Sequence, residues 1–177
     1  PHLWTLGQIA DFRDKLLWYK GVGIDGLTFA PEAGTQRMRD VINKNISDEE
    51  ILETVERVAK NGWSAIKLYF MVGFPTETQD DLDGLVDLVL RCRDLGRKHV
   101  AWFNCTASIG TLVPKPWTPF QWEPMEDLGS LKRKLAGVRR QLSAVPAVQV
   151  ETESPREGYL QTLLSRGDLQ RAAKEHE

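Results

Sequence analysis

Two periodicities of apolar residues alternate along the chain from residue 27 onward. Short β-prone apolar runs begin near residues 27, 65, 100 and 147, which are 38, 35 and 47 residues apart. Between these runs, apolar residues recur three or four positions apart, as on one face of a helix. Strands alternating with helices at such intervals are typical of βα units around a parallel sheet. The sequence therefore predicts an α/β fold, either an open doubly wound sheet or part of a barrel.

The predicted strands cover residues 27–30, 65–72, 100–108 and 147–152. The segment 65–72 is almost wholly apolar and shows little alternation, which predicts a parallel strand covered on both faces. Helix start signals lie between the strands: Ser47 and Glu50 have the spacing of a capping box, and Thr78 precedes Asp81 in the same way. Helical periodicity is also found at residues 7–20, 34–42, 128–142 and 159–164.

Composition narrows the functional classes. The 177 residues suffice for one domain, and a net charge of −2 excludes the basic footprint of a nucleic-acid or anionic-membrane binder. The longest apolar run, 68–74, is too short to span a bilayer, and no basic, apolar leader opens the chain. Cys92 and Cys105 have no CxxC spacing and are expected to be buried thiols. The three histidines do not cluster, so no metal ligand is predicted. The lack of a membrane span, a leader and a disulfide framework makes a cytoplasmic protein the expectation.

In either architecture, ligands bind at the C-terminal ends of the parallel strands. After the first strand, Gly34 could let the backbone approach a ligand and Glu32 could accept hydroxyl groups, although composition alone favours a helix-capping turn. After the second strand, Gly73 permits a tight turn and Glu77 is explained by capping. The loop at 108–122, rich in proline and aromatic residues, is as well explained by pocket lining as by barrel capping.

Taken together, these segments resemble the radical S-adenosylmethionine (radical SAM) enzymes. Residues 31–35 followed by 41–44 are similar to the fourth strand and helix of that family, with tRNA methylthiotransferases and oxygen-independent coproporphyrinogen oxidases as the most similar named groups. Residues 71–78 resemble the fifth strand, which usually ends in Gly-Phe-Pro-Gly-Glu-Thr. The residues at 28–35, 67–71 and 113–116 resemble those of a narrower group of radical SAM proteins, which carry an N-terminal cobalamin-binding-type domain. The likeness extends over residues 26–168 and implies half of a six-stranded (βα) barrel.

The resemblance assigns polar contacts with S-adenosylmethionine to three residues. Glu32 stands where the family places a polar residue on the ribose hydroxyls, and Lys44 matches a basic residue that meets the methionine carboxylate. A carboxylate accepts two hydroxyls and an ammonium pairs with a carboxylate, so both roles are chemically sound. Tyr69 occupies a position where many relatives have a ribose-binding aspartate.

The resemblance also assigns the adenine side of the site. Gly73 and Phe74 would let the adenine lie against the end of the fifth strand, and Ser108 with the proline-rich loop would close that side. These six residues are all cofactor-binding candidates. No catalytic residue and no metal ligand is predicted in this chain.

The family's cysteine loop, CxxxCxxC, is absent from the chain. The expectation is a truncated enzyme in which residues 1–25 are a poorly matched helical extension, 26–145 are the second half of the barrel, and 146–177 are a strand–helix extension with a charged tail. The [4Fe–4S] cluster would be bound only by the missing N-terminal half, and the chain alone should not form the 5′-deoxyadenosyl radical. Cobalamin is a further expected cofactor of the full-length protein, and the substrate stays unknown.

Open strand edges of a half-barrel predict self-association or pairing with a complementing chain. The alternative from another class is a non-catalytic α/β docking or pseudo-enzyme module. A third is another parallel-barrel enzyme with an unrelated ligand, which the lack of phosphate-binding glycines disfavours.

Overall fold

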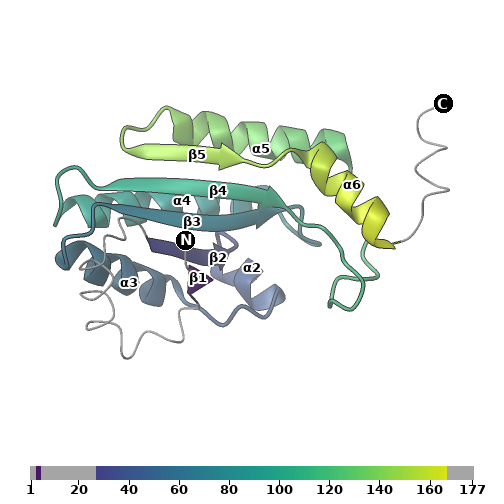
Figure 1. Ribbon diagram of the computed structural model, residues 1–177, viewed down its shortest axis with the longest axis horizontal. Coiled ribbons are helices and arrows are strands. Elements are labelled where there is room, and N and C mark those ends of the chain that lie inside the picture. The colour runs from purple at the N-terminus through teal and green to yellow at the C-terminus, as the bar shows by residue number, and fades with distance from the viewer. Residues whose placement is uncertain (1–2, 5–26, 167–177) are drawn as a thin grey trace.

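The computed structural model describes the backbone of Leu3–Trp4 and all of residues 27–166. The helix predicted at 7–20 and the charged tail predicted from Gln170 lie outside the described residues. A single parallel sheet organises the described chain (Figure 1). Its strands are β1 (Leu3–Trp4), β2 (Leu27–Glu32), β3 (Ala65–Val72), β4 (Asn104–Thr111) and β5 (Val148–Thr152).

The strands lie side by side in the order in which they occur along the chain, β1-β2-β3-β4-β5, and every adjacent pair is parallel. A doubly wound sheet reverses direction at a switch point, and this order contains no reversal. The predicted α/β fold is therefore confirmed in its barrel-type form, because unidirectional winding places all the crossover helices on one face. Strand β1 adds to the sheet a strand that the sequence pattern did not predict.

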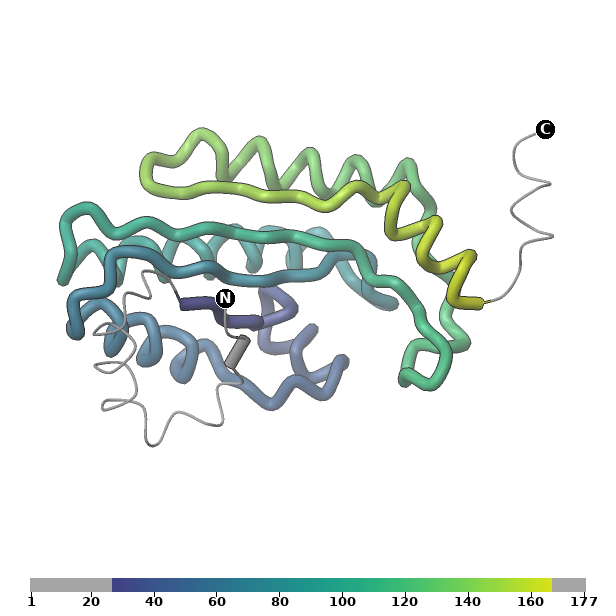
Figure 2. Tube along the Cα trace, viewed as in Figure 1, coloured from purple at the N-terminus to yellow at the C-terminus, as the bar shows by residue number. Residues whose placement is uncertain are grey.

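Five helices connect and follow the strands within residues 27–166: α2 (Gln36–Val41), α3 (Asp48–Lys60), α4 (Gln79–Arg97), α5 (Leu128–Ser143) and α6 (Pro155–Arg166). Figure 1 shows α4 behind β3 and β4, while α2, α6 and the loop after β4 gather at the ends to which the strands point. The tube in Figure 2 follows this path, with that loop projecting beyond the sheet. The Ser47–Glu50 capping box is confirmed, with the Ser47 N–H donating to Glu50 over 2.8 Å.

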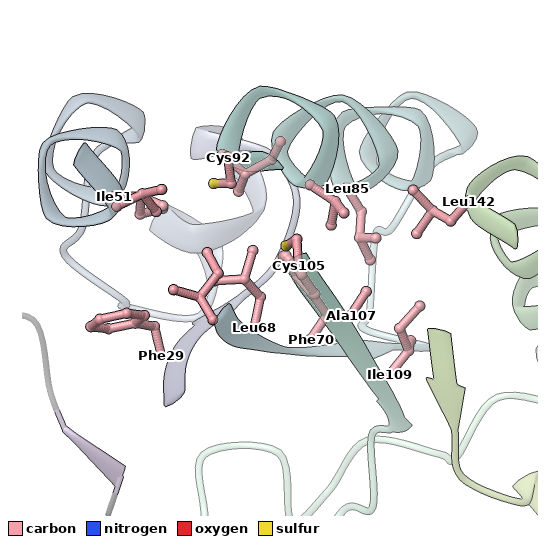
Figure 3. Packing of buried hydrophobic residues seen from close by; sticks show 14 of the residues in the cluster. Phe29, Ile51, Leu68, Phe70, Leu85, Cys92, Cys105, Ala107, Ile109 and Leu142 are labelled. Carbon is pink, nitrogen blue, oxygen red and sulfur yellow. The ribbon is translucent and has the colours of Figure 1, made fainter. Parts of the chain in front are cut away.

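The main core lies between the sheet and α3, α4 and α5. Figure 3 shows Leu68 and Phe70 of β3, together with Cys105, Ala107 and Ile109 of β4, directed towards helix residues including Leu85. All six are buried, and this close-packed layer provides most of the apolar stabilisation.

Strand β3 corrects the prediction that both of its faces are covered. Burial alternates along the strand: Leu68 and Phe70 are buried on the helix side, whereas Lys67, Tyr69 and Met71 are only partly buried on the other. We call that second side of the sheet the open face. Threonine, lysine, tyrosine and glutamate side chains line this face together with alanine and methionine.

Strand β4, the third of the predicted strands, begins at Asn104 rather than at Val100. Helix α4 continues to Arg97, and the Phe103 N–H donates to the Val100 carbonyl in the turn that follows. Val100 and Phe103 are both buried, so the apolar run at 100–103 belongs to a turn that enters the core. The strand extends to Thr111, three residues beyond its predicted end.

Candidate functional site

A cavity of about 410 Å³ opens on the open face near the C-terminal ends of β2, β3 and β4. Its volume is within the usual range for small-molecule sites. The residues that line it are Thr28, Ala30, Glu32, Lys67, Tyr69, Phe70, Met71, Gly110, Thr111 and Glu153. Two carboxylates and one ammonium among them leave the lining with a net negative charge.

Glu32 and Lys44, the two main predicted ligands, lie together. The Lys44 Nζ is 3.4 Å from the Glu32 Oε1, and about a quarter of each side chain is exposed. Glu32 has a φ of 71°, a left-handed conformation that costs a non-glycine residue of the order of 1 kcal/mol. Such strain at the end of a strand, beside a cavity, is typical of functional positions.

Tyr69 and Lys67 share the open face of β3. The Lys67 Nζ lies 5.3 Å from the centroid of the Tyr69 ring and forms an ion pair with Glu151 of β5. The hydrogen bond to Glu151 raises the pKa of Lys67, so its positive charge is well maintained. Lys67 and Tyr69 thus bring a fixed cation and a phenol to the cavity wall.

The remaining predicted ligands do not line the cavity. Ser108 is buried and is paired in register with Tyr69 in the sheet. Gly73 has a φ of 89°, and a Cβ there would come within 2.7 Å of a Leu131 methyl group. Phe74 is buried in a small second core, 6.0 Å from the Phe120 ring.

Gly34 has a packing role in the structure, whereas the sequence analysis considered that it could let the backbone approach a ligand. A Cβ at this position would lie 2.1 Å from the Leu85 nitrogen and 2.3 Å from its Cα. The missing side chain therefore lets the turn after β2 pack directly on the backbone of α4.

Glu77 does not cap α4, contrary to the prediction. Its Oε2 accepts from the Gly73 N–H at 2.9 Å and from the Lys134 Nζ of α5 at 2.8 Å. Burial raises the pKa of Glu77 against the opposing effect of Lys134, which also binds Glu126. The buried carboxylate therefore joins the turn after β3 to α5. The capping role belongs to Asp81, which accepts from the Thr78 N–H over 2.8 Å.

Asp81 also connects the two turns. It accepts hydrogen bonds from the Thr35 hydroxyl and from Arg37, which also donates to the Thr76 carbonyl at 3.0 Å. Burial opposes its ionisation, but these donors outweigh burial and hold the pKa of Asp81 well below its usual range. The ends of β2 and β3 are thereby held in one rigid arrangement.

The described residues do not fit an iron–sulfur cluster. Cys92 and Cys105 are buried on the helix side of the sheet, where burial raises the pKa of both thiols, that of Cys105 to about 12. Residues 27–166 contain no group of three or more His, Cys, Asp or Glu side chains arranged to hold a metal ion. Within the same range, no helix is both long and apolar enough to cross a bilayer.

Donors and acceptors in and beside the cavity, in contrast, match the chemistry of S-adenosylmethionine. Glu32 and Lys44 offer groups for a diol and a carboxylate, and the negative lining suits a sulfonium cation. Thr111 also lines the cavity, but its hydroxyl is fully buried against Gly158 of α6 and has no hydrogen-bond partner among the described residues.

Sequence reasoning missed Lys67, Glu151 and Glu153. Glu151 and Glu153 follow the last residue of β4 by 40 and 42 positions, and the pairing of β5 with β4 brings Glu153 to the cavity and Glu151 to Lys67. Gly110 was the one local sign of this arrangement. It has no side chain, and a Cβ added there would lie 2.8 Å from the Glu153 Oε2, so the glycine leaves room for that carboxylate.

Parts of this sequence are similar to known proteins. Residues 5–89 match the model of the radical SAM superfamily, a range that begins inside the segment 1–25 set apart above. An uncharacterized protein of Methanocaldococcus jannaschii is 37% identical over 142 residues, which cover 80% of this chain and 30% of that protein. A tRNA-2-methylthio-N(6)-dimethylallyladenosine synthase of Petrotoga mobilis is 32% identical over 63 residues, 35% of this chain and 14% of the enzyme. The chain thus spans less than a third of either relative. Residues 5–89 are therefore similar to the radical SAM superfamily, and the α/β fold is consistent with part of a radical SAM barrel.

Proposed function

We propose that this chain is the S-adenosylmethionine-binding part of a radical SAM enzyme, and that the cofactor binds in the cavity on the open face. The observation that carries the proposal is the meeting of Glu32 and Lys44, twelve residues apart in sequence, at the rim of the sheet beside that cavity. In radical SAM chemistry, reductive cleavage of S-adenosylmethionine at an iron–sulfur cluster yields methionine and a 5′-deoxyadenosyl radical. The described residues would bind and orient the cofactor for that reaction.

The Glu32–Lys44 ion pair is compatible with ligand binding. An ammonium has three donors and a carboxylate has about four acceptor positions, so one contact between them leaves capacity on both. Lys44 can meet the methionine carboxylate while Glu32 accepts the ribose hydroxyls. Tyr69, which lines the cavity, supplies a further polar contact. The roles of Gly73, Phe74 and Ser108 are indirect in this proposal, because they support the strand ends rather than line the cavity.

Calorimetric titration of the 177-residue chain with S-adenosylmethionine tests the proposal. Glu32→Ala and Lys44→Ala should each weaken binding about tenfold, the effect of losing one hydrogen bond to a charged group. Glu53→Ala and Lys60→Ala are matched controls, because these residues form ion pairs within α3, and they should leave the affinity unchanged. A folded chain that does not bind, or that binds equally well without Glu32 and Lys44, would contradict the proposal.

Self-association is a second part of the proposal. Strands β1 and β5 lie at opposite edges of the described sheet, and pairing between two copies would cover such edges. Sedimentation velocity should show a concentration-dependent dimer, and a monomer throughout the micromolar range would contradict it. A cytoplasmic location, a cobalamin cofactor in the whole protein and the division at residues 26 and 146 stay predictions.

A further inference from the structure

Arg39 is the largest fully buried side chain of the described residues, with no exposed surface. It lies on the short helix α2, between the segments that carry Glu32 and Lys44. A guanidinium cannot lose its proton in a protein, so its burial is unfavourable unless its N–H groups are paired. Arg39 meets this requirement through backbone carbonyls and side chains of three segments.

Two of the partners adjoin the proposed ligands. The Arg39 Nη1 donates to the carbonyl of Ala33, the residue after Glu32, at 3.1 Å. The Nε donates at 2.9 Å to the carbonyl of Ile46, two residues after Lys44. The backbone adds a third connection, because the Lys44 N–H donates to the Arg39 carbonyl at 2.8 Å. One residue therefore connects the turn that carries Glu32 to the loop that carries Lys44.

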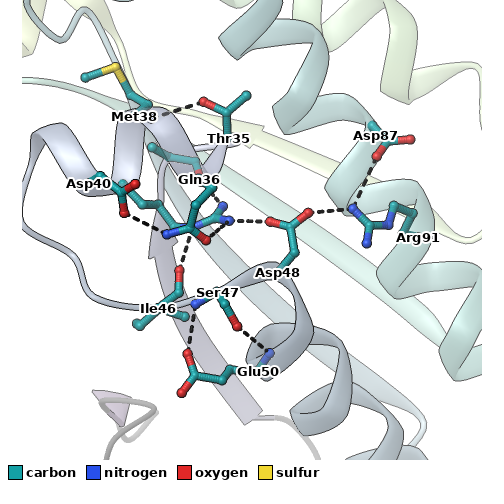
Figure 4. Close-up of polar contacts among 12 residues, drawn as sticks. Thr35, Gln36, Met38, Asp40, Ile46, Ser47, Asp48, Glu50, Asp87 and Arg91 are labelled. Atoms are coloured by element: carbon teal, nitrogen blue, oxygen red, sulfur yellow. Dashed lines mark hydrogen bonds and ion pairs between the residues drawn. The ribbon is translucent and has the colours of Figure 1, made fainter.

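The other side of the guanidinium is held by Asp48, which we call the acidic anchor. Its Nη2 donates to Gln36 at 3.3 Å and forms an ion pair with Asp48, which also accepts from the Arg91 Nη1 at 2.6 Å. Burial opposes ionisation of Asp48, but the hydrogen bonds from Arg91 and Arg39 outweigh it and lower the pKa of Asp48. Figure 4 shows Gln36, Ile46 and Asp48 grouped around one point, with Arg91 beyond Asp48.

We propose that Arg39 is a positioning residue for the cofactor: it sets the spacing between Glu32 and Lys44 and thereby determines how strongly the site recognises the amino-acid group of S-adenosylmethionine. This inference rests on the proposed function. It differs from a merely structural role, in which Arg39 would stabilise the fold without influencing which part of the ligand is recognised.

Two thioethers separate these roles. S-adenosylhomocysteine and 5′-methylthioadenosine share the adenosine and the sulfur, but only the first carries the amino-acid group. The unmodified chain should prefer S-adenosylhomocysteine, and Lys44→Ala should reduce that preference about tenfold. Arg39→Lys retains the positive charge but loses the planar guanidinium with its several N–H donors. It should reduce the preference for S-adenosylhomocysteine by a similar factor. Arg91→Lys keeps a cation beside Asp48 and leaves the contact between Asp48 and Arg39 in place, so it should leave the preference unchanged.

Each outcome decides a different question. If the unmodified chain binds neither thioether nor S-adenosylmethionine, the proposed function and this inference both fail. If it shows a preference that depends on Lys44 and that Arg39→Lys leaves intact, only the inference on Arg39 is overturned. Should Arg39→Lys not fold, Asp48→Asn, which weakens the anchor and leaves the guanidinium in place, should reduce the preference about threefold. An unchanged preference in that variant would overturn the inference.

Discussion

The two faces of the sheet are built from alternate residues of the same strands, yet they differ in chemistry. On the helix side, Leu68 and Phe70 are buried in an apolar layer. On the open face, their neighbours Lys67 and Tyr69 line a cavity that contains charged and hydroxyl groups. In this sheet the packed core lies on one side of the strands and the cavity on the other, so substitutions one position apart should have separable effects.

The largest expected effect is on the helix side. Leu68→Ala should reduce the free energy of unfolding by about 2–5 kcal/mol, because it leaves a cavity among fully buried side chains. Lys67→Ala, one residue earlier, removes a partly exposed ion pair and should cost less than about 1 kcal/mol. Chemical denaturation measures both. Equal losses would show that the open face also contributes to the core.

Gly34→Ala should be next in size, at about 3 kcal/mol. The new Cβ would meet the Leu85 backbone, which cannot move aside as a flexible side chain can. Gly137→Ala is the matched control, because a Cβ there meets nothing within 4 Å. Thermal melts of the two variants should differ clearly, and a stable Gly34→Ala protein would mean that the turn and α4 are not in contact.

Asp81→Asn should reduce stability by about 2 kcal/mol at pH 7, because it removes a buried acceptor of charge-assisted hydrogen bonds. The pKa of Asp81 is lower in the folded than in the unfolded state, so its stabilising effect is complete above the unfolded value near 3.8 and is lost as the pH falls towards the folded value. The difference between the two proteins should therefore shrink below about pH 4. A difference that is constant from pH 7 to pH 2 would contradict the assignment.

The smallest expected effect concerns strain. Glu32→Gly should be more stable than Glu32→Ala by about 0.5–1 kcal/mol, because glycine adopts the left-handed conformation freely. Both variants lose the carboxylate and should lose cofactor affinity alike. Matched denaturation curves measure the difference, and a more stable alanine variant would show that this position is unstrained.

The sequence predicted local features better than contacts across the sheet. The Ser47–Glu50 capping box and the strand at 65–72 depend on neighbouring residues, and both are confirmed. The sequence could indicate the pairing of Glu32 with Lys44, because both residues flank one short helix. Lys67–Glu151 and Glu77–Lys134 join residues 84 and 57 positions apart. These contacts depend on strand register and helix placement, which no local pattern encodes. The apolar run at Val100 was misread because a buried turn and a buried strand have the same composition.

The most direct test of the account is a crystal structure of the chain with S-adenosylmethionine. The account predicts the ligand in the cavity on the open face, with its ribose at Glu32 and its methionine carboxylate at Lys44. A ligand bound on the helix side of the sheet, or on the open face without contact with either residue, would contradict it.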